Sequence, residues 1–203
     1  ALKQASDYLE EQPDLDKISA ICGKVIKNGK MDINHGKYYY KKGIRICEAS
    51  IPAEMYEKKE FEMGSFTYVG TIMNKKKLLE AGLPNKDYFI YWDDLEHGIR
   101  MRKTGKIIGV PGIVAYHDVG EEGSGINWKL YYSYRNMIDT YRKHFSGVCY
   151  DYFCLKIRVK IFLNHMTGHK KLELNILEEA FKNARQQKFG LHPVYRPGWK
   201  PGE

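Results

Sequence analysis

Two adjacent carboxylates follow an aromatic run in the stretch "DYFIYWDDLEHGIRMRKTGKIIGVPGIVAYHD", residues 87–118. Neighbouring side chains on a turn point in different directions. One carboxylate of Asp93 and Asp94 can therefore abstract a proton while the other holds a substrate hydroxyl. Trp92 adds a flat apolar face, which suits the C–H face of a sugar ring. The alternative is structural, because the free N–H groups and dipole of a helix stabilise acids in its first turn.

Two histidines in the same stretch are candidate ligands. His97 has helical spacing to both aspartates, which permits a metal or an intrahelical pair, but a helical histidine of this kind is typical of a solvated surface, where we expect it. His117 ends the apolar segment "GIVAYH" and is followed by Asp118 and the loop "GEEGSG". A structural strand-end histidine is the alternative to a ligand, and the loop after it could close over a bound molecule.

The composition indicates a folded protein with a concentrated positive charge. The 203 residues are 43% hydrophobic, carry 16 tyrosines against 8 phenylalanines and have a net charge of +8. Most of this charge lies between Lys129 and Lys170, where we expect a solvated helical face, a phosphate-bearing ligand or a lipid surface. The sequence contains no recognisable nucleic-acid motif, so nucleic acid is not an expected partner.

The cysteines and termini bear on localisation. Cys22, Cys47, Cys149 and Cys154 form no C-x-x-C pair and no zinc pattern, which predicts reduced thiols and a cytoplasmic protein. No apolar run is long enough to span a bilayer. The sequence begins at Ala1 within helix-like sequence, and we expect it to be a fragment.

Periodicity and turn residues predict helices at both ends of the chain and mixed strands between them. The order favours an α/β fold followed by an all-helical region. The expected helices are 1–12, 75–82, 93–105, 127–145, 150–166 and 172–187; the expected strands are 17–30, 64–74 and two within 106–118. Residues 31–62 are expected to be irregular, with "KYYYKKGIRI" a candidate for short strands, and the tail from 190 is expected to be extended.

Two of the late helices have faces of interest. The helix over 127–145 is expected to turn one stripe inward (Leu130, Tyr134, Met137, Tyr141, Phe145) and a polar stripe outward (Arg135, Asn136, Asp139, Lys143). The helix over 150–166 is apolar on most sides, with Lys156, Arg158 and Lys160 interleaved. It is expected either to pack on the rest of the chain or to lie against anionic lipid as a peripheral contact.

The stretch from "GSFTYVGTIMN" through "GLPNKDYFIYWDDLEHGIR" to "GIVAYHD", followed by "YYSYRN", resembles the second half of a family 2 glycosyltransferase of the GT-A fold. It is similar to the branch that includes bacterial rhamnosyl- and galactofuranosyltransferases, and the W-D-D-x-E form of Trp92–Glu96 is similar to the latter. The opening "LEEQPDLDKISAICGKVIKNGK" also resembles the segment after that family's nucleotide-sugar D-x-D motif. The resemblance covers roughly residues 1–145.

This resemblance implies a fold and a set of roles. The fold would be the C-terminal part of a GT-A nucleotide-diphospho-sugar transferase. Asp94 would be the general base, and Asp93 and Trp92 would hold the acceptor. His117 would join the D-x-D carboxylates in binding Mg²⁺ or Mn²⁺. From its sign and position, Arg135 is a further candidate for binding the diphosphate.

The function that follows is an inverting glycosyltransferase of bacterial cell-surface polysaccharide synthesis. It would use a nucleotide-diphospho-sugar donor and a glycan or lipid-linked glycan acceptor, in the cytoplasm or peripherally on the inner face of the plasma membrane. The alternatives are a non-catalytic carbohydrate-binding or interaction domain and a basic nucleic-acid binder. No D-x-D closes an apolar strand, since Asp14-Leu15-Asp16 follows Pro13, so these residues are expected to be inactive alone. The expected domains are an acceptor-side half at 1–125, a helical region at 126–190 and an extended tail at 191–203.

Overall fold

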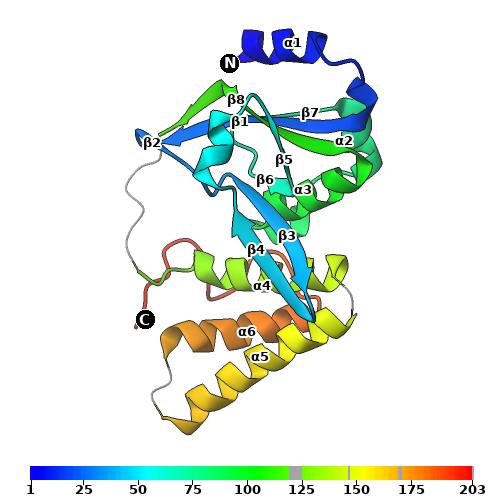
Figure 1. Cartoon of the computed structure of the whole chain (residues 1–203). Coiled ribbons are helices and arrows are strands. Elements are labelled where there is room, and N and C mark those ends of the chain that lie inside the picture. The colour runs from blue at the N-terminus through cyan, green and yellow to red at the C-terminus, as the bar shows by residue number, and fades with distance from the viewer. Residues whose placement is uncertain (119–124, 146, 169–170, 203) are drawn as a thin grey trace. The chain divides into compact units, whose positions relative to one another are not determined.

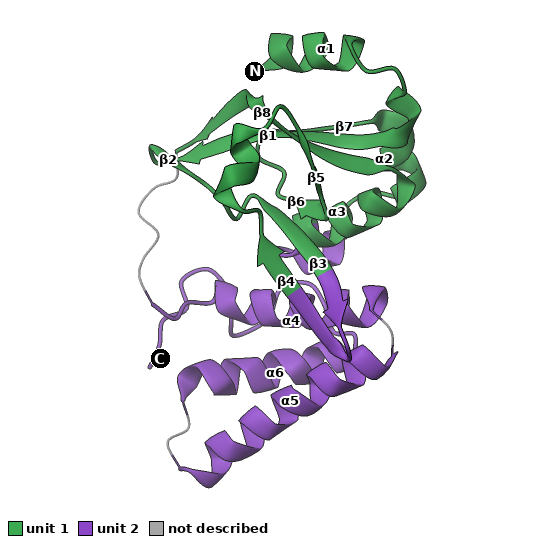
Figure 2. Ribbon diagram, in the orientation of Figure 1, with its two compact units in different colours: residues 1–39, 48–84, 94–122 green, residues 40–47, 85–93, 123–203 purple. Residues whose placement is uncertain are grey.

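The structure is a computed structural model that describes residues 1–118, 125–145, 147–168 and 171–202, and the chain is a mixed α/β protein with helices at its C-terminal end (Figure 1). Its contacts divide it into two compact units (Figure 2). Unit 1 comprises residues 1–39, 48–84 and 94–122, and unit 2 comprises 40–47, 85–93 and 123–203. The predicted α/β class is confirmed, whereas the GT-A assignment and the predicted domain limits stay predictions.

Two parallel strands, β1 (Ile18–Lys27) and β8 (Lys106–His117), form the centre of unit 1. β1 ends in a turn at Asn28 and Gly29, whose φ angles of 48° and 78° match the predicted Asn-Gly turn, and β2 (Lys30–Met31) follows. The strand order is β2-β1-β8-β5, and β7 also pairs with β1. The remaining strands of this sheet are β5 (Phe61–Met63) and β7 (Thr71–Met73).

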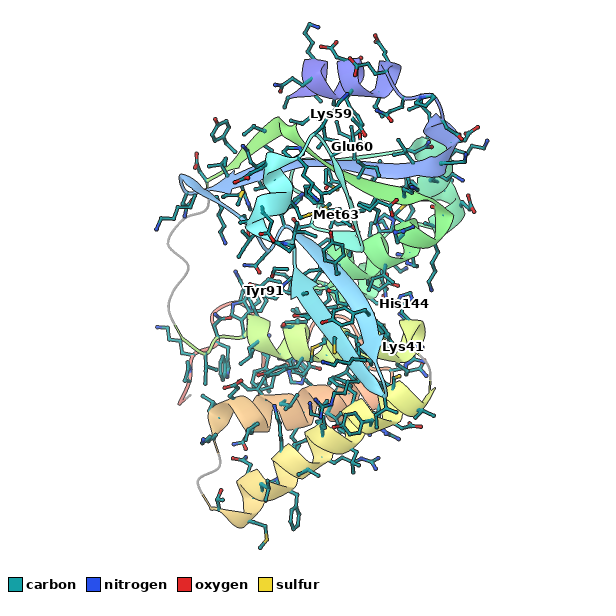
Figure 3. The ribbon with its side chains drawn as sticks, viewed as in Figure 1. Lys41, Lys59, Glu60, Met63, Tyr91 and His144 are labelled. Atoms are coloured by element: carbon teal, nitrogen blue, oxygen red, sulfur yellow. The ribbon has the colours of Figure 1, made fainter. Side chains whose placement is uncertain are left out.

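The central strands are buried on both faces, as their continuous apolar sequence requires. On one face Ile21 and Ile108 pack against Ala5 and Tyr8 of α1 (Leu2–Glu10). On the other face the core is made by Ala20, Cys22, Ile51, Tyr56, Phe61, Met63, Phe66, Met101 and Ile107 (Met63 is labelled in Figure 3). The four cysteines are free thiols, in agreement with the prediction.

Two predicted strand patterns are wrong in detail. The strand expected over 64–74 is interrupted by Gly70, which has a φ of 65°, and the segment splits into β6 (Ser65–Phe66) and β7 on different sheets. The two strands expected within 106–118 are instead the single strand β8. The sequence predicted a break between two strands at Pro111 and Gly112. The structure has a register shift there instead, because Val110 pairs with Gly23 and Val114 pairs with the next residue, Lys24.

Residues 31–62 are more regular than predicted. β3 (Gly36–Lys42) and β4 (Arg45–Ser50) form a hairpin around Gly43, whose φ is 59°, and the second sheet has the order β4-β3-β6. The short helix η1 (Leu15–Lys17) precedes β1, and the short helix η2 (Ala53–Glu57) follows β4. The short strands indicated for "KYYYKKGIRI" are present, although its three consecutive tyrosines do not show the alternation that marks a strand.

α2 and α3 complete unit 1. α2 (Lys75–Ala81) begins at Asn74, whose side chain accepts from the backbone N–H groups of Lys76 and Lys77, as predicted. α3 (Asp93–Thr104) begins at the acid pair and ends before Gly105, also as predicted. Gly105 lies so close to Lys17 and Ser19 that a β-carbon there would meet backbone atoms at 2.8 and 3.0 Å.

Unit 2 contains the short helix η3 (Lys86–Tyr88) and three long helices, α4 (Lys129–His144), α5 (Gly147–Met166) and α6 (Leu172–Arg185). The prediction of α5 and α6 is confirmed. Their shared core is made by Ile138, Cys154, Ile157, Leu177, Phe181 and Ala184. Within the described residues, no helix is both long and apolar enough to cross a membrane.

The predicted orientation of α4 is wrong. Arg135, Asn136 and Asp139, which were expected to face solvent, are buried, while Leu130 and Met137 are only partly buried. The polar residues are buried because they bind backbone and side-chain groups of the segment before α3, as described below. A helical polar stripe does not by itself show whether its partners are water or protein.

Candidate functional site

The acid pair lies at the start of α3, and the division between the units falls between its two residues. Asp93 belongs to unit 2 and Asp94 to unit 1. Both side chains are half-exposed. Asp94 Oδ1 accepts from the backbone N–H of Leu95 at 2.7 Å, so the amino end of the helix contributes a donor to this carboxylate. Asp94 thus combines accessibility with a fixed position, as a general base requires.

Glu96, the last residue of the W-D-D-x-E sequence, has a structural partner. Its side chain is buried, and both carboxylate oxygens lie 3.0 Å from Nε of Arg100. The same guanidinium donates to the carbonyls of Ala81, Gly82 and Leu83, which leave the carboxyl end of α2. A cation there stabilises the unpaired carbonyls and the helix dipole. Glu96 therefore fixes α3 against α2.

The prediction that His97 lies on the surface is wrong. The side chain is fully buried in unit 1, with Nδ1 3.1 Å from the hydroxyl of Tyr68 and the ring in a T-shaped contact with Phe66. The adjacent Gly98 explains this burial, because a β-carbon there would lie 2.3 Å from Oγ of Ser65. This face of α3 packs directly on β6, and the glycine was the signal that sequence reasoning missed.

His117 is the last residue of β8, as predicted, and pairs in register with Lys27 at the carboxyl end of β1. The described residues contain no group of three or more His, Cys, Asp and Glu side chains that could hold a metal ion. A ligand role for His117 therefore stays a prediction. The glycine-rich segment that was expected to act as a lid is residues 120–125, of which 120–124 lie outside the described residues.

Asp14 and Asp16 are far from His117 within unit 1. They flank the start of β1, where Ile18 pairs with Lys106, whereas His117 lies at the opposite end of the same strand pair. Ten residues of strand separate these ends by roughly 30 Å. Asp14 pairs with Lys17 instead, at 2.5 Å. That this D-x-D is not the nucleotide-sugar motif stays a prediction.

The aromatic segment before α3 has an unusual backbone. Phe89 has φ 65° and ψ −57°, and the N–H of Ile90 donates to the carbonyl of Tyr88 at 2.8 Å, which defines a γ-turn with a positive central φ. Tyr91 and Trp92 also have positive φ, 61° and 67°. Each such non-glycine residue costs about 1–3 kcal/mol, and the cost persists only where surrounding contacts impose it.

Asn136 of α4 supplies those contacts from within unit 2. Its amide nitrogen lies 3.0 Å from the carbonyl oxygens of Tyr88 and Ile90 and 2.8 Å from that of Tyr91. The Tyr88 hydroxyl in turn donates to Oδ2 of Asp139 at 2.8 Å. The amide thus gathers three carbonyls of a strained turn around one buried nitrogen.

Arg135 reinforces this contact. It is 1% exposed, and its guanidinium donates to Oδ1 of Asn136 at 3.0 Å and to the carbonyls of Tyr88 at 3.1 Å and Gly190 at 2.8 Å. Burial lowers the pKa of the guanidinium. Its flat face is covered by the rings of Tyr131, Tyr132 and Phe189. We name Arg135 and Asn136 together the α4 clamp.

The aromatic side chains around the clamp differ in accessibility. Trp92 is 8% exposed, and its ring meets Tyr141 edge-on at 5.7 Å. Phe89 and Tyr91 are 49% and 42% exposed (Tyr91 is labelled in Figure 3). The exposed ring surface is therefore provided by residues that the sequence analysis did not single out, while the predicted Trp92 offers little.

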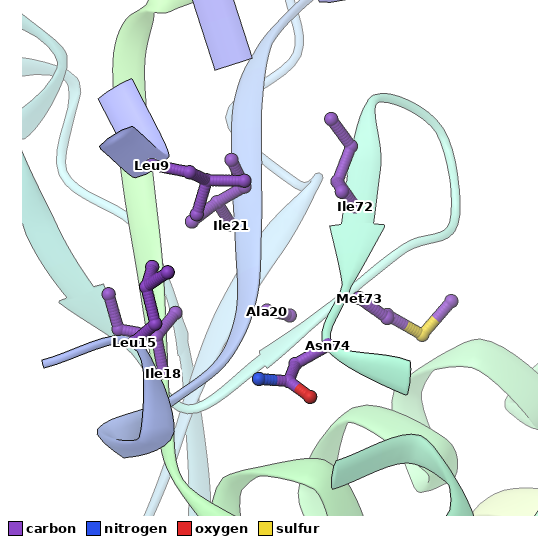
Figure 4. A pocket seen from close by; sticks show the side chains of 8 residues that line it. All are labelled: Leu9, Leu15, Ile18, Ala20, Ile21, Ile72, Met73 and Asn74. Carbon is purple, nitrogen blue, oxygen red and sulfur yellow. The ribbon is translucent and has the colours of Figure 1, made fainter. Parts of the chain in front are cut away.

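Each unit also contains a pocket that is separate from the acid pair and from His117. The pocket in Figure 4, of about 140 Å³, is apolar apart from Asn74 and is lined by Leu9, Leu15, Ile18, Ala20, Ile21, Ile72 and Met73 of unit 1. A pocket of about 260 Å³ in unit 2 is lined by Arg135, Glu179, Asn183 and His192 among others. Neither contains Asp93, Asp94 or His117.

Comparison with known proteins yields partial similarities. No family model matches the sequence. The chain is 26% identical over 117 residues to galactofuranosyltransferase GlfT2 of Mycolicibacterium smegmatis, which covers 48% of this chain and 18% of that protein. It is 20% identical over 142 residues to the probable GTP-binding protein EngB of Helicobacter pylori, which covers 68% of this chain and 58% of that protein. The chain thus spans less than two thirds of each relative.

The sequence distinguishes between these similarities. The phosphate-binding loop G-x-x-x-x-G-K-S/T requires Ser or Thr after its Gly-Lys pair, where the hydroxyl binds Mg²⁺. The Gly-Lys pairs of this chain, which begin at Gly23, Gly29, Gly36 and Gly105, are followed by Val, Met, Tyr and Ile. None of these four pairs therefore completes the phosphate-binding loop.

Proposed function

We propose that this chain carries the acceptor side of an inverting GT-A glycosyltransferase. The enzyme would transfer a sugar from a nucleotide-diphospho-sugar to a hydroxyl of a glycan or lipid-linked glycan. The observation that carries the proposal is the acid pair at the start of α3, with Asp94 half-exposed and held by the helix N-terminus. The similarity to a galactofuranosyltransferase supports the same class, so galactofuranose is the first sugar to test.

In this mechanism Asp94 accepts the proton of the acceptor hydroxyl as its oxygen attacks the anomeric carbon. The new C–O bond forms on the face opposite the departing diphosphate, so the configuration inverts. Asp93 accepts a hydrogen bond from a second acceptor hydroxyl, and Trp92 supports the loop that carries both. The exposed rings of Phe89 and Tyr91 offer apolar faces for the sugar.

The donor side of the reaction finds less support in these residues. Binding of Mg²⁺ or Mn²⁺ at His117 would need carboxylate ligands, and the described residues do not group it with two further ligands. Arg135 would have to leave three carbonyl acceptors to reach a diphosphate, so a role in holding the aromatic loop agrees better with its contacts.

The test is acceptor-dependent release of nucleoside diphosphate by the complete gene product that contains these residues. Asp94→Asn should lower kcat by about 10²–10⁴-fold, because loss of a general base has this effect. Asp87→Asn is the matched control, since Asp87 is an exposed acid seven residues earlier, and it should leave kcat unchanged. Circular dichroism establishes that both variants fold.

Retention of full kcat by Asp94→Asn would reject the proposed base. The alternative, a non-catalytic carbohydrate-binding domain, predicts a different result. Glycan binding would then be measurable by saturation-transfer NMR and weakened by removal of the Tyr91 ring, without nucleoside diphosphate release from any donor. The 203 residues alone are expected to bind acceptor without transferring sugar.

A further inference from the structure

α5 has two apolar faces, and only one of them packs within unit 2. Cys149, Cys154 and Ile157 are buried on the inner face. The opposite face exposes apolar side chains at helical spacing, namely Val148, Leu155, Val159, Phe162, Leu163 and Met166. At 100° per residue these positions fall within about 60° of one direction and extend over roughly 27 Å. We name them the α5 stripe.

Positive charge borders the α5 stripe on both sides. Lys156 and Lys160 lie on one flank of the helix and Arg158 on the other, and all three are exposed. Within the described part of the chain these three side chains form no ion pair, whereas Arg142 and Lys143 of α4 each pair with Asp139 at 2.7 Å. The acid of α5, Asp151, lies between Val148 and Leu155 in sequence, on the same flank of the helix as Arg158.

We propose that the α5 stripe is a membrane-docking surface that binds the headgroup and upper acyl region of an anionic bilayer. The apolar side chains would enter the lipid while the flanking cations reach the phosphate groups, as long basic side chains do at an interface. A helix of this kind lies in the membrane plane, in agreement with its interrupted apolar sequence. The proposal does not depend on transferase activity.

An anionic surface fits better than a second copy of the chain. Two copies joined through the α5 stripe would bring two sets of unpaired Lys and Arg side chains together around the interface. A bilayer containing anionic lipid supplies the opposite charge along the whole 20-residue helix. An anionic bilayer can therefore bind both the apolar side chains of the α5 stripe and the positive charges beside them.

The experiment measures partition of the 203-residue chain onto vesicles of phosphatidylcholine with and without phosphatidylglycerol, at low and high salt. Wild type should bind the anionic vesicles in a salt-dependent manner. Leu155→Glu should weaken this binding at least about tenfold, because a buried leucine contributes that much. Leu79→Glu is the matched control, since Leu79 is 65% exposed on α2 and Leu155 is 57% exposed on α5. It should bind as wild type does.

The charge contribution is tested separately. The triple change Lys156→Gln, Arg158→Gln and Lys160→Gln should weaken binding on the order of 100-fold, because each cation near an anionic surface contributes about fivefold. The control triple Lys30→Gln, Lys58→Gln and Lys75→Gln alters the same net charge on exposed lysines of unit 1 and should have little effect.

Three results would overturn the proposal: no binding of wild type to anionic vesicles, equal binding to neutral vesicles, or equal losses in the stripe variants and their controls. Sedimentation velocity tests the competing explanation, in which a second copy of the chain binds the α5 stripe. A dimer that Leu155→Glu dissociates, without vesicle binding by wild type, would assign the α5 stripe to self-association.

Discussion

Asn136→Ala tests whether the α4 clamp holds the strained aromatic loop. The amide nitrogen carries two hydrogens and faces three carbonyls, one of which, that of Tyr88, also accepts from Arg135. The substitution therefore leaves the carbonyls of Ile90 and Tyr91 without this donor. An unsatisfied buried polar group costs about 1–3 kcal/mol. Because these carbonyls are only partly buried, we expect a total loss of about 2–4 kcal/mol in the free energy of unfolding.

Urea unfolding followed by tryptophan fluorescence measures this loss in the correct part of the chain. All three tryptophans, Trp92, Trp128 and Trp199, lie in unit 2, so their emission reports that unit alone. Trp92 is 8% exposed in the intact protein. If the loop loosens, native emission should also move to longer wavelength, before any unfolding, because water then reaches the indole.

Asn183→Ala is the matched control for this prediction. Asn183 is also a buried amide of unit 2, but it donates to the Tyr131 hydroxyl and to Oε1 of Glu179. Glu179 can bind water instead, so the expected loss is about 1 kcal/mol. If Asn136→Ala costs no more than Asn183→Ala and leaves the emission maximum unchanged, the clamp does not hold the loop and the reasoning is refuted.

Two further predictions concern unit 1. Gly98→Ala should destabilise the protein by about 1–3 kcal/mol despite alanine's helix propensity, because the new methyl would meet Oγ of Ser65 at 2.3 Å, whereas Gly147→Ala, with open space around it, should be neutral or slightly stabilising. Burial lowers the pKa of His35 to about 4, so the unfolded state binds a proton that the native state does not, and stability should fall by about 2 kcal/mol between pH 7 and pH 5.

Both predictions need a readout of unit 1, since the tryptophans lie elsewhere. Labelling of the buried Cys22 thiol by a disulfide reagent that reacts at acidic pH, read by mass spectrometry, reports opening of the core around β1. His35→Gln should flatten the pH dependence, and His165→Gln, on an exposed helical site of unit 2, should not. Equal slopes in both variants would exclude His35 as the source. Equal labelling of Gly98→Ala and Gly147→Ala would contradict the first prediction.

The elements that local signals specify could be predicted from the sequence. The Asn-Gly turn after β1, the Asn74 cap of α2 and the start of α3 at the acid pair each depend on residues adjacent in sequence. The burial of His97 and the inward polar face of α4 could not be predicted, because their partners are distant in sequence. Asn136 binds carbonyls 45–48 residues earlier, and a backbone carbonyl carries no residue type that a sequence could show.

In the candidate site, too, features set by neighbouring residues could be predicted and features set by distant contacts could not. Asp93 and Asp94 were found from their types and position, and the structure places Asp94 where a helix N-terminus holds it. The exposed rings of Phe89 and Tyr91 depend on the positive φ angles of their loop, which aromatic residues rarely adopt. A sequence pattern gives no indication of that backbone.

The conformation of the aromatic loop is energetically costly, which indicates that it serves a function. Glycine at Phe89, Tyr91 or Trp92 would adopt a positive φ without strain, and an apolar residue at Arg135 would avoid burying a charge. The chain instead combines three strained aromatic residues with a buried guanidinium and a buried amide, immediately before two half-exposed carboxylates. Such strain persists where the surroundings impose it and is concentrated at functional sites. This arrangement therefore favours a loop selected to orient Asp93 and the neighbouring aromatic rings of the same unit towards a ligand over one selected for stability.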